Sequence, residues 1–215
     1  MAHSKELRVP ELEQAQQFLA EAKKLNPGPW VSHSIHVAEA AKAIAAADSA
    51  LDADCSYVLG LLHDIGRREG RTSMRHIIDG YEFLHSQGHE AAASICLTHS
   101  FPLQNTDAAF GEWDCTKEDR FFVDRYIKNI EYTDYDKLIQ LCDSLALQTG
   151  FVLIEKRMVD VALRYGTNNL TSKKWQATFQ IRDYFDQRIG TSIYHKLTGV
   201  VENTFAHFGY ENPRG

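Results

Sequence analysis

The sequence predicts an all-α fold, built as a single-domain helical bundle. Apolar residues recur at helical spacing through nearly the whole chain, strand signals are few, and no internal repeat or convincing linker divides it. The chain has 215 residues, of which 44% are hydrophobic, and this is enough for one well-packed core. We therefore expect one domain over residues 1–215, with a central part at about 30–150 and C-terminal helices over 151–208 packed on it.

The first half of the chain predicts five helices. Pro10 favours a helix start, and the Asn-Pro-Gly-Pro run at 26–29 ends that helix. The third predicted helix is unusually apolar, as expected of a central helix. Thr72 or Ser73 is expected to cap the fourth helix. The predicted ranges are about 10–25, 30–47, 53–65, 72–86 and 89–98.

The second half predicts a long loop followed by five more helices. Residues 100–115 carry Pro, Gly, Asn and Asp without a sustained period, and a loop of this length either closes over a site or packs on the core. Both alternatives stay open for its aromatic residues. Thr116 and Asp119 resemble a capping box that opens the next helix. The predicted ranges are about 118–129, 134–148, 151–165, 173–188 and 191–207.

Composition and charge disfavour several classes of protein. The formal net charge is −6, and an acidic chain is poorly suited to long nucleic acid, whose binding needs a broad basic surface. No apolar run approaches the about 18 residues of a membrane span, and no secretory signal is visible at the N-terminus. The four cysteines lie far apart, as expected of free thiols in a reducing compartment. We therefore expect a cytoplasmic protein without a membrane partner.

Histidine and aspartate residues within apolar helical segments predict a metal site. The pair His63-Asp64 ends the apolar third helix, and Asp143 lies within another apolar segment. A buried ionised carboxylate is costly unless a cation compensates it. Neutral histidine with carboxylate suits Zn, Mn or Fe, and four nitrogen and two oxygen donors are enough for two ions bridged by one carboxylate. The candidate set is His33, His63, Asp64, His76, His99 and Asp143, with His36 as an alternative to His33 because both share one helix face.

The segment after Asp64 is strongly basic. Residues 65–75 contain four arginines and one acid, Glu69, which is a local charge of +3. Each arginine alone is consistent with a solvated loop. Next to a metal site, the group suggests phosphate binding, because the guanidinium presents a planar pair of donors. Arg71 and Arg75 lie one turn apart if the next helix starts early.

The order of these segments resembles the HD-domain superfamily of metal-dependent phosphohydrolases. The resemblance covers about residues 30–150 and rests on HSIHVAEAAKAIA, LLHDIGR, the helix with His76, LTHS and LCDSLAL, with HDIG as in one subgroup. It implies an all-helical fold in which His33, His63, Asp64 and Asp143 bind a first divalent metal. It also implies that His76 and His99 serve a second ion, with Asp64 as the bridge. Two departures distinguish the chain from the subgroup that cleaves cyclic dinucleotides: Ser100 stands where that subgroup usually has a second consecutive histidine, and no Gly-Tyr-Pro follows the helix with His76.

This resemblance implies hydrolysis of a phosphate ester or anhydride of a small molecule, a nucleotide in particular, by metal-activated water. The expected cofactor is one or two divalent ions (Mn, Fe, Zn, Co or Mg). The expected catalytic residues are Asp64, Arg67, which stands where the subgroup commonly has Lys, and Arg71. Two alternatives stay open: a di-iron oxygenase with the same ligands, and a non-catalytic domain that senses a nucleotide. The expected partner is a small phosphorylated substrate, and the apolar C-terminal helices leave a homo-oligomer open.

Overall fold

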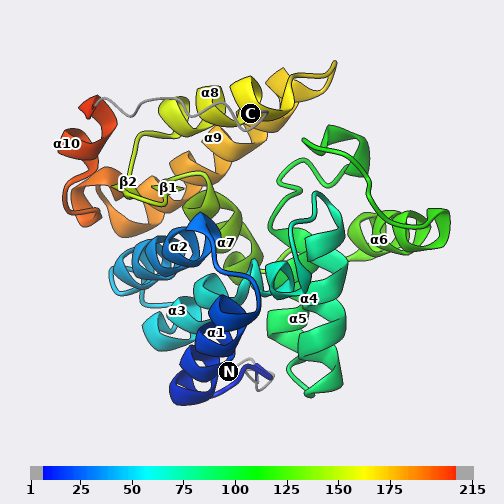
Figure 1. The fold of residues 1–215 in the computed structure, drawn as a ribbon. Helices are drawn as coiled ribbons and strands as arrows, with labels where there is room; N and C mark the ends of the chain where they lie inside the picture. The colour runs from blue at the N-terminus through cyan, green and yellow to red at the C-terminus, as the bar shows by residue number, and fades with distance from the viewer. Residues whose placement is uncertain (1–6, 207–215) are drawn as a thin grey trace.

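The computed structural model describes residues 7–206, which form ten α-helices, three short 3-10 helices and one two-stranded antiparallel sheet (Figure 1). The α-helices are α1 (Leu12–Leu25), α2 (Pro29–Ala45), α3 (Ala53–Leu62), α4 (Arg75–Ser86), α5 (Glu90–Thr98), α6 (Lys117–Asn129), α7 (Asp134–Asp143), α8 (Ile154–Tyr165), α9 (Thr171–Ile189) and α10 (Val200–Phe205). The 3-10 helices are η1 (Ile65–Glu69), η2 (Thr106–Ala108) and η3 (Ile193–Lys196), and the strands are β1 (Ala146–Leu147) and β2 (Gly150–Phe151). The predicted all-α class is confirmed.

Two groups of helices meet around α7. Helices α2 and α3 pack against each other and α3 also packs on α1, while α4 and α5 form the second group (Figure 1). Helix α7 contacts α2, α3 and α5 and so lies between the groups, and α8 and α9 lie across one end of the molecule. No helix within residues 7–206 is both long enough and apolar enough to cross a membrane.

The close contact of α2 with α3 explains why α3 is the central helix. A Cβ atom built on Gly60 of α3 would lie 2.7 Å from the Cα atom of Ala38 on α2. The two backbones approach so closely because neither residue has a large side chain there. On the other faces of α3, four apolar side chains are buried in the main core: Val58, Leu59, Leu61 and Leu62.

The fourth helix starts later than predicted and is capped from elsewhere in the chain. It begins at Arg75, and its N-cap residue, Met74, makes no side-chain cap. The backbone N–H groups of Ser73 and Arg75 instead donate to the Asp114 carboxylate, at 2.6 and 2.8 Å. The prediction that Thr72 or Ser73 caps this helix is therefore wrong. A carboxylate from the long loop provides the negative charge that a helix N-terminus favours.

Several other boundaries differ from the prediction. The third helix ends at Leu62 because the chain tightens into η1. The helix predicted over 134–148 ends at Asp143, and a hairpin follows in which Gly150 has a φ of 137°. The last predicted helix, 191–207, divides into η3 and α10 at Gly199, whose φ is 79°, and residue 207 lies outside the described residues. The capping box of Thr116 and Asp119 is confirmed.

Helix α9 connects the C-terminal part of the chain to the main core. Phe185 is fully buried in that core. Arg188 binds the buried Asp48 with two nitrogens, Nε to Oδ2 at 2.7 Å and Nη2 to Oδ1 at 2.9 Å. Arg188 also donates to Asp134 at the start of α7. These contacts join α9 to both the α2–α3 connection and α7.

Candidate metal centre

His63 and Asp64 lie where α3 ends and η1 begins. His63 is the last residue with helical geometry, and Asp64 has a φ of −107° and a ψ of 15°. This break in the helix lets two consecutive side chains face one centre, with His63 Nε2 3.9 Å from Asp64 Oδ2. Both residues are buried.

Asp64 is shared by two groups of three residues. The first group is His33, His63 and Asp64, and the second is Asp64, His76 and His99. Within each group, one ligand-type atom from every residue lies within 4.8 Å of the others. Asp64 Oδ1 is 3.1 Å from His76 Nε2 and 3.7 Å from His99 Nε2. We call these five residues the His-Asp cluster; all of them are buried.

Backbone carbonyls orient three of the histidines. Nδ1 of His63 lies 2.7 Å from the Gly60 carbonyl oxygen, Nδ1 of His99 lies 3.2 Å from that of Ile95, and Nδ1 of His76 lies against that of Ser73. A carbonyl oxygen can only accept, so each Nδ1 carries the proton and donates. In the neutral imidazole, Nε2 then presents a lone pair, as in histidines that bind metals through this atom.

The electrostatics of the cluster favour a neutral His99 and an ionised Asp64. Burial and the neighbouring His63 lower the pKa of His99 to about 3. Burial alone would raise the pKa of the Asp64 carboxyl, but the Arg67 guanidinium and the adjacent His76 hold it well below its usual range.

Two polar atoms at the centre lack hydrogen-bond partners among the described residues. They are His63 Nε2 and Asp64 Oδ1, both fully buried. Lone pairs that face one another in a buried space repel unless a cation lies between them, and buried polar atoms are rarely left unsatisfied. Imidazole nitrogen with carboxylate oxygen is a donor set for a divalent transition metal. The residues present therefore fit such an ion.

Arg67 lies at the cluster. Its Nε donates to Asp64 Oδ2 at 2.6 Å, and its Nη2 lies 3.5 Å from His76 Nε2. The 3-10 geometry of η1 places Arg67 three residues after Asp64 on the same side.

Arg71 is not brought into the cluster. Its side chain is exposed and has no hydrogen bond or ion pair within residues 7–206. The chain leaves η1 at Gly70, which has a φ of 135°, and α4 starts only at Arg75, so the expected one-turn spacing of Arg71 and Arg75 does not form. Arg75 instead pairs with Asp79 and Asp119.

Asp143 lies beside the cluster, at the C-terminal end of α7. Its Oδ1 is 3.0 Å from His33 Nε2, and its side chain is 26% exposed. Burial would raise the pKa of this carboxyl, and the contact with His33 holds it well below the usual range. His36 points elsewhere: its Nδ1 lies 2.9 Å from the carbonyl oxygen of Leu147 in the hairpin. Of the two alternatives, only His33 lies among the other candidate ligands.

Two cationic residues near Asp143 were missed by the sequence analysis. Arg157 of α8 lies with Nη2 3.5 Å from Asp143 Oδ1, and Lys174 of α9 lies with Nζ 4.4 Å from the ring centroid of Phe110. Burial lowers the pKa of Lys174 to about 8, although the charge of Asp143 opposes this shift. Both residues lie beyond the motif-bearing segment and in no motif of their own, so no signal in the sequence could have found them.

The long loop contributes aromatic side chains both to a core and to an open pocket. Phe101 is fully buried and stacks on Trp113, with ring centroids 6.2 Å apart, in a small second core under α4, α5 and α6. Core packing is therefore the correct alternative for these two residues. Phe121 is 63% exposed on α6, whereas Phe110 lines a pocket.

The fold and the cluster define an all-α protein with a buried histidine and aspartate site suited to a divalent metal. The family model for the HD domain matches residues 30–148, which is more than half of the chain, and the protein belongs to this family. Members of this family are typically metal-dependent phosphohydrolases. Searches of the curated proteins and of the solved structures gave no match.

Proposed function

We propose that this protein is a metal-dependent phosphohydrolase that cleaves a phosphate ester or anhydride of a small molecule, a nucleotide in particular. The observation that carries the proposal is the shared, buried Asp64, which belongs to both groups of the cluster and has one oxygen without a hydrogen-bond partner among the described residues. A carboxylate between two sets of histidines is the arrangement expected for two ions. Family membership supports the same class of reaction.

The residues divide into two ligand sets in this proposal. His33, His63, Asp64 and Asp143 would hold a first divalent ion, and Asp64, His76 and His99 a second. Mn, Fe, Zn, Co and Mg remain the candidate ions. When bound, a divalent metal polarises a phosphoryl oxygen and lowers the pKa of water.

In this proposal, Arg67 is the side chain that binds the phosphoryl group of the substrate. Asp64 holds its Nε, which directs the guanidinium along the cluster toward His76. A planar guanidinium can donate to two phosphoryl oxygens and stabilise the charge that develops on them. Because the cluster residues are buried, these interactions act with little screening by water.

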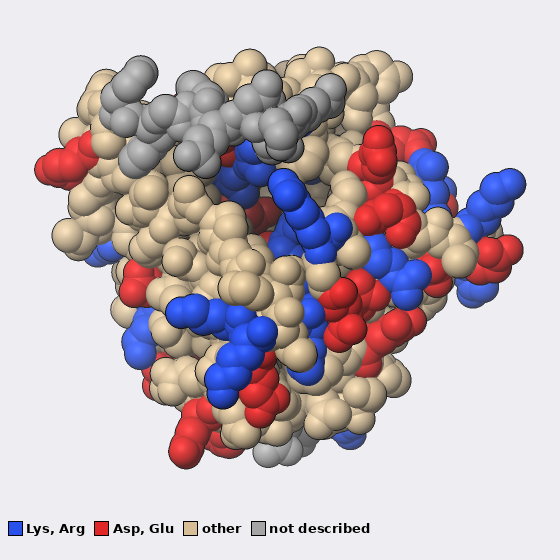
Figure 2. Space-filling view, viewed as in Figure 1, with Lys and Arg blue, Asp and Glu red and all other residues tan. Residues whose placement is uncertain are grey.

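The surface is consistent with a small anionic substrate. Figure 2 shows Lys and Arg side chains at a hollow in the upper half of this face, while basic and acidic side chains both occur over the remainder. Together with the net charge of −6, this distribution favours a small phosphorylated partner over a long nucleic acid. A cytoplasmic location remains part of the proposal.

The test pairs metal analysis with turnover. Wild type, Asp64→Ala and the control Asp54→Asn, an exposed residue of α3, are analysed for bound metal and assayed on phosphate esters and nucleotides with Mn, Mg, Co and Fe. We expect Asp64→Ala to lose bound metal and hydrolysis together and Asp54→Asn to retain both. Full turnover without metal would contradict the proposal. Substrate-dependent oxygen consumption by an iron-loaded protein would favour the oxygenase, and nucleotide binding without turnover would favour the sensor.

A further inference from the structure

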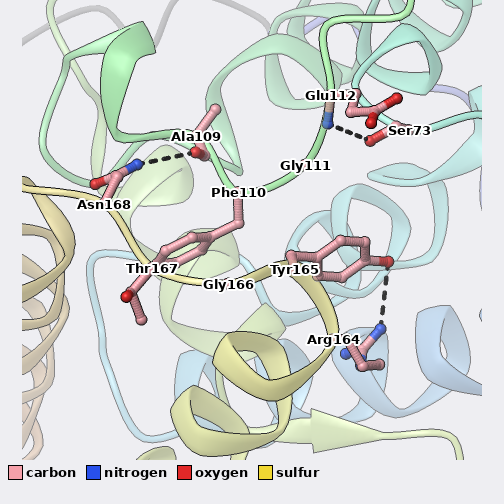
Figure 3. A pocket seen from close by; sticks show the side chains of 10 residues that line it. All are labelled: Ser73, Ala109, Phe110, Gly111, Glu112, Arg164, Tyr165, Gly166, Thr167 and Asn168. Atoms are coloured by element: carbon pink, nitrogen blue, oxygen red, sulfur yellow. Dashed lines mark hydrogen bonds between the residues drawn. The ribbon is translucent and has the colours of Figure 1, made fainter. Parts of the chain in front are cut away.

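A pocket opens beside the cluster, between the long loop and the turn that joins α8 to α9. Its volume is about 380 Å³, and Phe110 and Tyr165 are the aromatic residues of its lining (Figure 3). Ser73, Glu112, Arg164 and Thr167 provide its polar lining. The size is within the range of small-molecule sites in proteins. Most of these residues lie outside the segment that matches the HD family, or in its loop.

Contacts connect one side of the pocket to the second ligand group. The carbonyl oxygen of Ser73, which lines the pocket, accepts from His76 Nδ1. A ligand in the pocket would therefore lie next to the residue that orients His76.

A chain of ion pairs connects the other side to the first ligand group. Arg164 donates to Asp160 at 2.7 Å, and Asp160 accepts from Arg157 at 3.0 Å. Arg157 in turn lies 3.5 Å from Asp143. Lys174 adds a second connection, because it lies over Phe110 and interacts electrostatically with Asp143. The ion pairs thus link Arg164 in the lining of the pocket to Asp143 beside the cluster.

Hydrogen bonds join the chain segments that line the pocket. Asn168 Nδ2 donates to the carbonyl oxygens of Asp107 and Ala109, at 3.2 and 3.3 Å, and so ties the α8–α9 turn to the loop (Figure 3). Glu112 N–H donates to the Ser73 hydroxyl at 3.0 Å at the other edge. Both aromatic rings lie on the same side of these two connections, below them in the view (Figure 3).

The lining suits an uncharged planar group better than a phosphate. Its cation, Arg164, is already paired with Asp160, and Glu112 is acidic and has no side-chain partner within the described part of the chain. Lys174, the other nearby cation, lies over one face of Phe110, and Arg164 lies over one face of Tyr165. A nucleobase would stack on the opposite face of either ring, an interaction with little dependence on sequence.

We propose that this pocket binds the base of a nucleotide whose phosphate ester lies at the His-Asp cluster. The inference rests on the proposed function, since it takes the cluster as the phosphoryl site.

The first test compares substrates that differ only in the base. Phe110→Ala, Tyr165→Ala and the control Phe121→Ala, an exposed aromatic residue of α6, are assayed on the four nucleoside 5′-monophosphates and on ribose 5-phosphate. Stacking worth about 1–3 kcal/mol predicts a rise in KM of about 5- to 150-fold for the nucleotides in the two pocket variants, with kcat nearly unchanged. The values for ribose 5-phosphate and for the control should stay within about twofold of wild type. Equal losses on ribose 5-phosphate, or no loss on any nucleotide, would overturn the inference.

A second measurement separates this inference from the proposed function. Binding of the same nucleotides is measured by calorimetry with wild type and the three variants, whose folding is checked by circular dichroism. If wild type shows no hydrolysis but binds a nucleotide, and Phe110→Ala weakens binding while Phe121→Ala does not, the proposed function fails and the pocket assignment stands. If wild type hydrolyses other phosphate esters and binds no nucleotide, the pocket assignment fails and the proposed function stands.

Discussion

The backbone of Gly66 lies directly against the carbonyl oxygen of His76: a Cβ atom at position 66 would be 2.0 Å from that oxygen. The same atom would be 2.3 Å from the backbone nitrogen of Gly80. Helix η1, which follows Asp64 and carries Arg67, is therefore pressed against α4, which carries His76. This contact gives a physical reason for the glycine in the string His-Asp-Ile-Gly.

Gly66→Ala should push η1 away from α4 and disturb both halves of the cluster. We expect a loss of about 3 kcal/mol in the free energy of unfolding, at the upper end for overpacking, because the obstacle is backbone and cannot rotate away. Urea unfolding and metal analysis provide the measurement. Gly28→Ala is the control, because its Cβ would meet only the Trp30 side chain, at 3.1 Å, and its cost should stay below about 1 kcal/mol. Equal stability of the two variants would contradict this account.

Arg67 and Arg71 should differ sharply when each is replaced by lysine. Arg67→Lys loses the planar donor pair next to Asp64, so we expect kcat/KM for the phosphate substrate to fall by about 10-fold or more. Arg71→Lys changes an exposed side chain and should stay within about twofold of wild type. Steady-state kinetics at matched metal content decide this. A comparable fall in Arg71→Lys would show that the exposed arginine reaches the substrate.

Asp114 should make α4 sensitive to acid. The backbone N–H groups of Ser73 and Arg75 hold the pKa of this carboxyl below its usual range, against the effect of burial. A folded-state pKa below the unfolded value contributes stability that is present above about pH 4 and is lost as the pH falls through the folded pKa. Asp114→Asn should therefore cost about 1 kcal/mol at pH 7, as a lost helix cap does, and less as the pH falls toward 3.

Chemical denaturation of Asp114→Asn and wild type at several pH values measures this difference. Asp54→Asn, an exposed carboxyl paired with Lys42, is the matched control and should show a much smaller effect. A gap between wild type and Asp114→Asn that is constant from pH 7 to 3 would rule out the carboxylate as the cause.

Arg188 should contribute strongly to the free energy of unfolding. Arg188→Ala leaves the Asp48 carboxylate buried without its bidentate partner, and we expect a loss of about 3 kcal/mol. Lys173→Ala, an exposed residue of the same helix, should change stability by less than about 0.5 kcal/mol.

Thermal unfolding of wild type should show one cooperative transition. Two separate transitions would contradict the prediction of a single domain over residues 1–215.

The sequence by itself was sufficient for the fold class and for the composition of the candidate site. Helical periodicity depends on neighbours three and four residues apart, which are visible in one sequence, and so α1, α2 and α5 lie within two residues of the predicted ranges. The histidines and Asp64 could be proposed because polar donors within apolar helices need a partner. Their residue types restrict that partner to a cation or a hydrogen-bonding group.

Tertiary structure alone decided the rest, because contacts between distant segments leave no local pattern. Asp114 caps α4 from about forty residues away, so no local motif near Thr72 could predict that helix start. Arg71 and Arg157 are both basic residues, yet only Arg157 lies at Asp143, because α8 packs across the end of the bundle. The proposed substrate side of the site therefore depends on how the C-terminal helices meet the loop, and the periodicity of either segment carries no information about that contact.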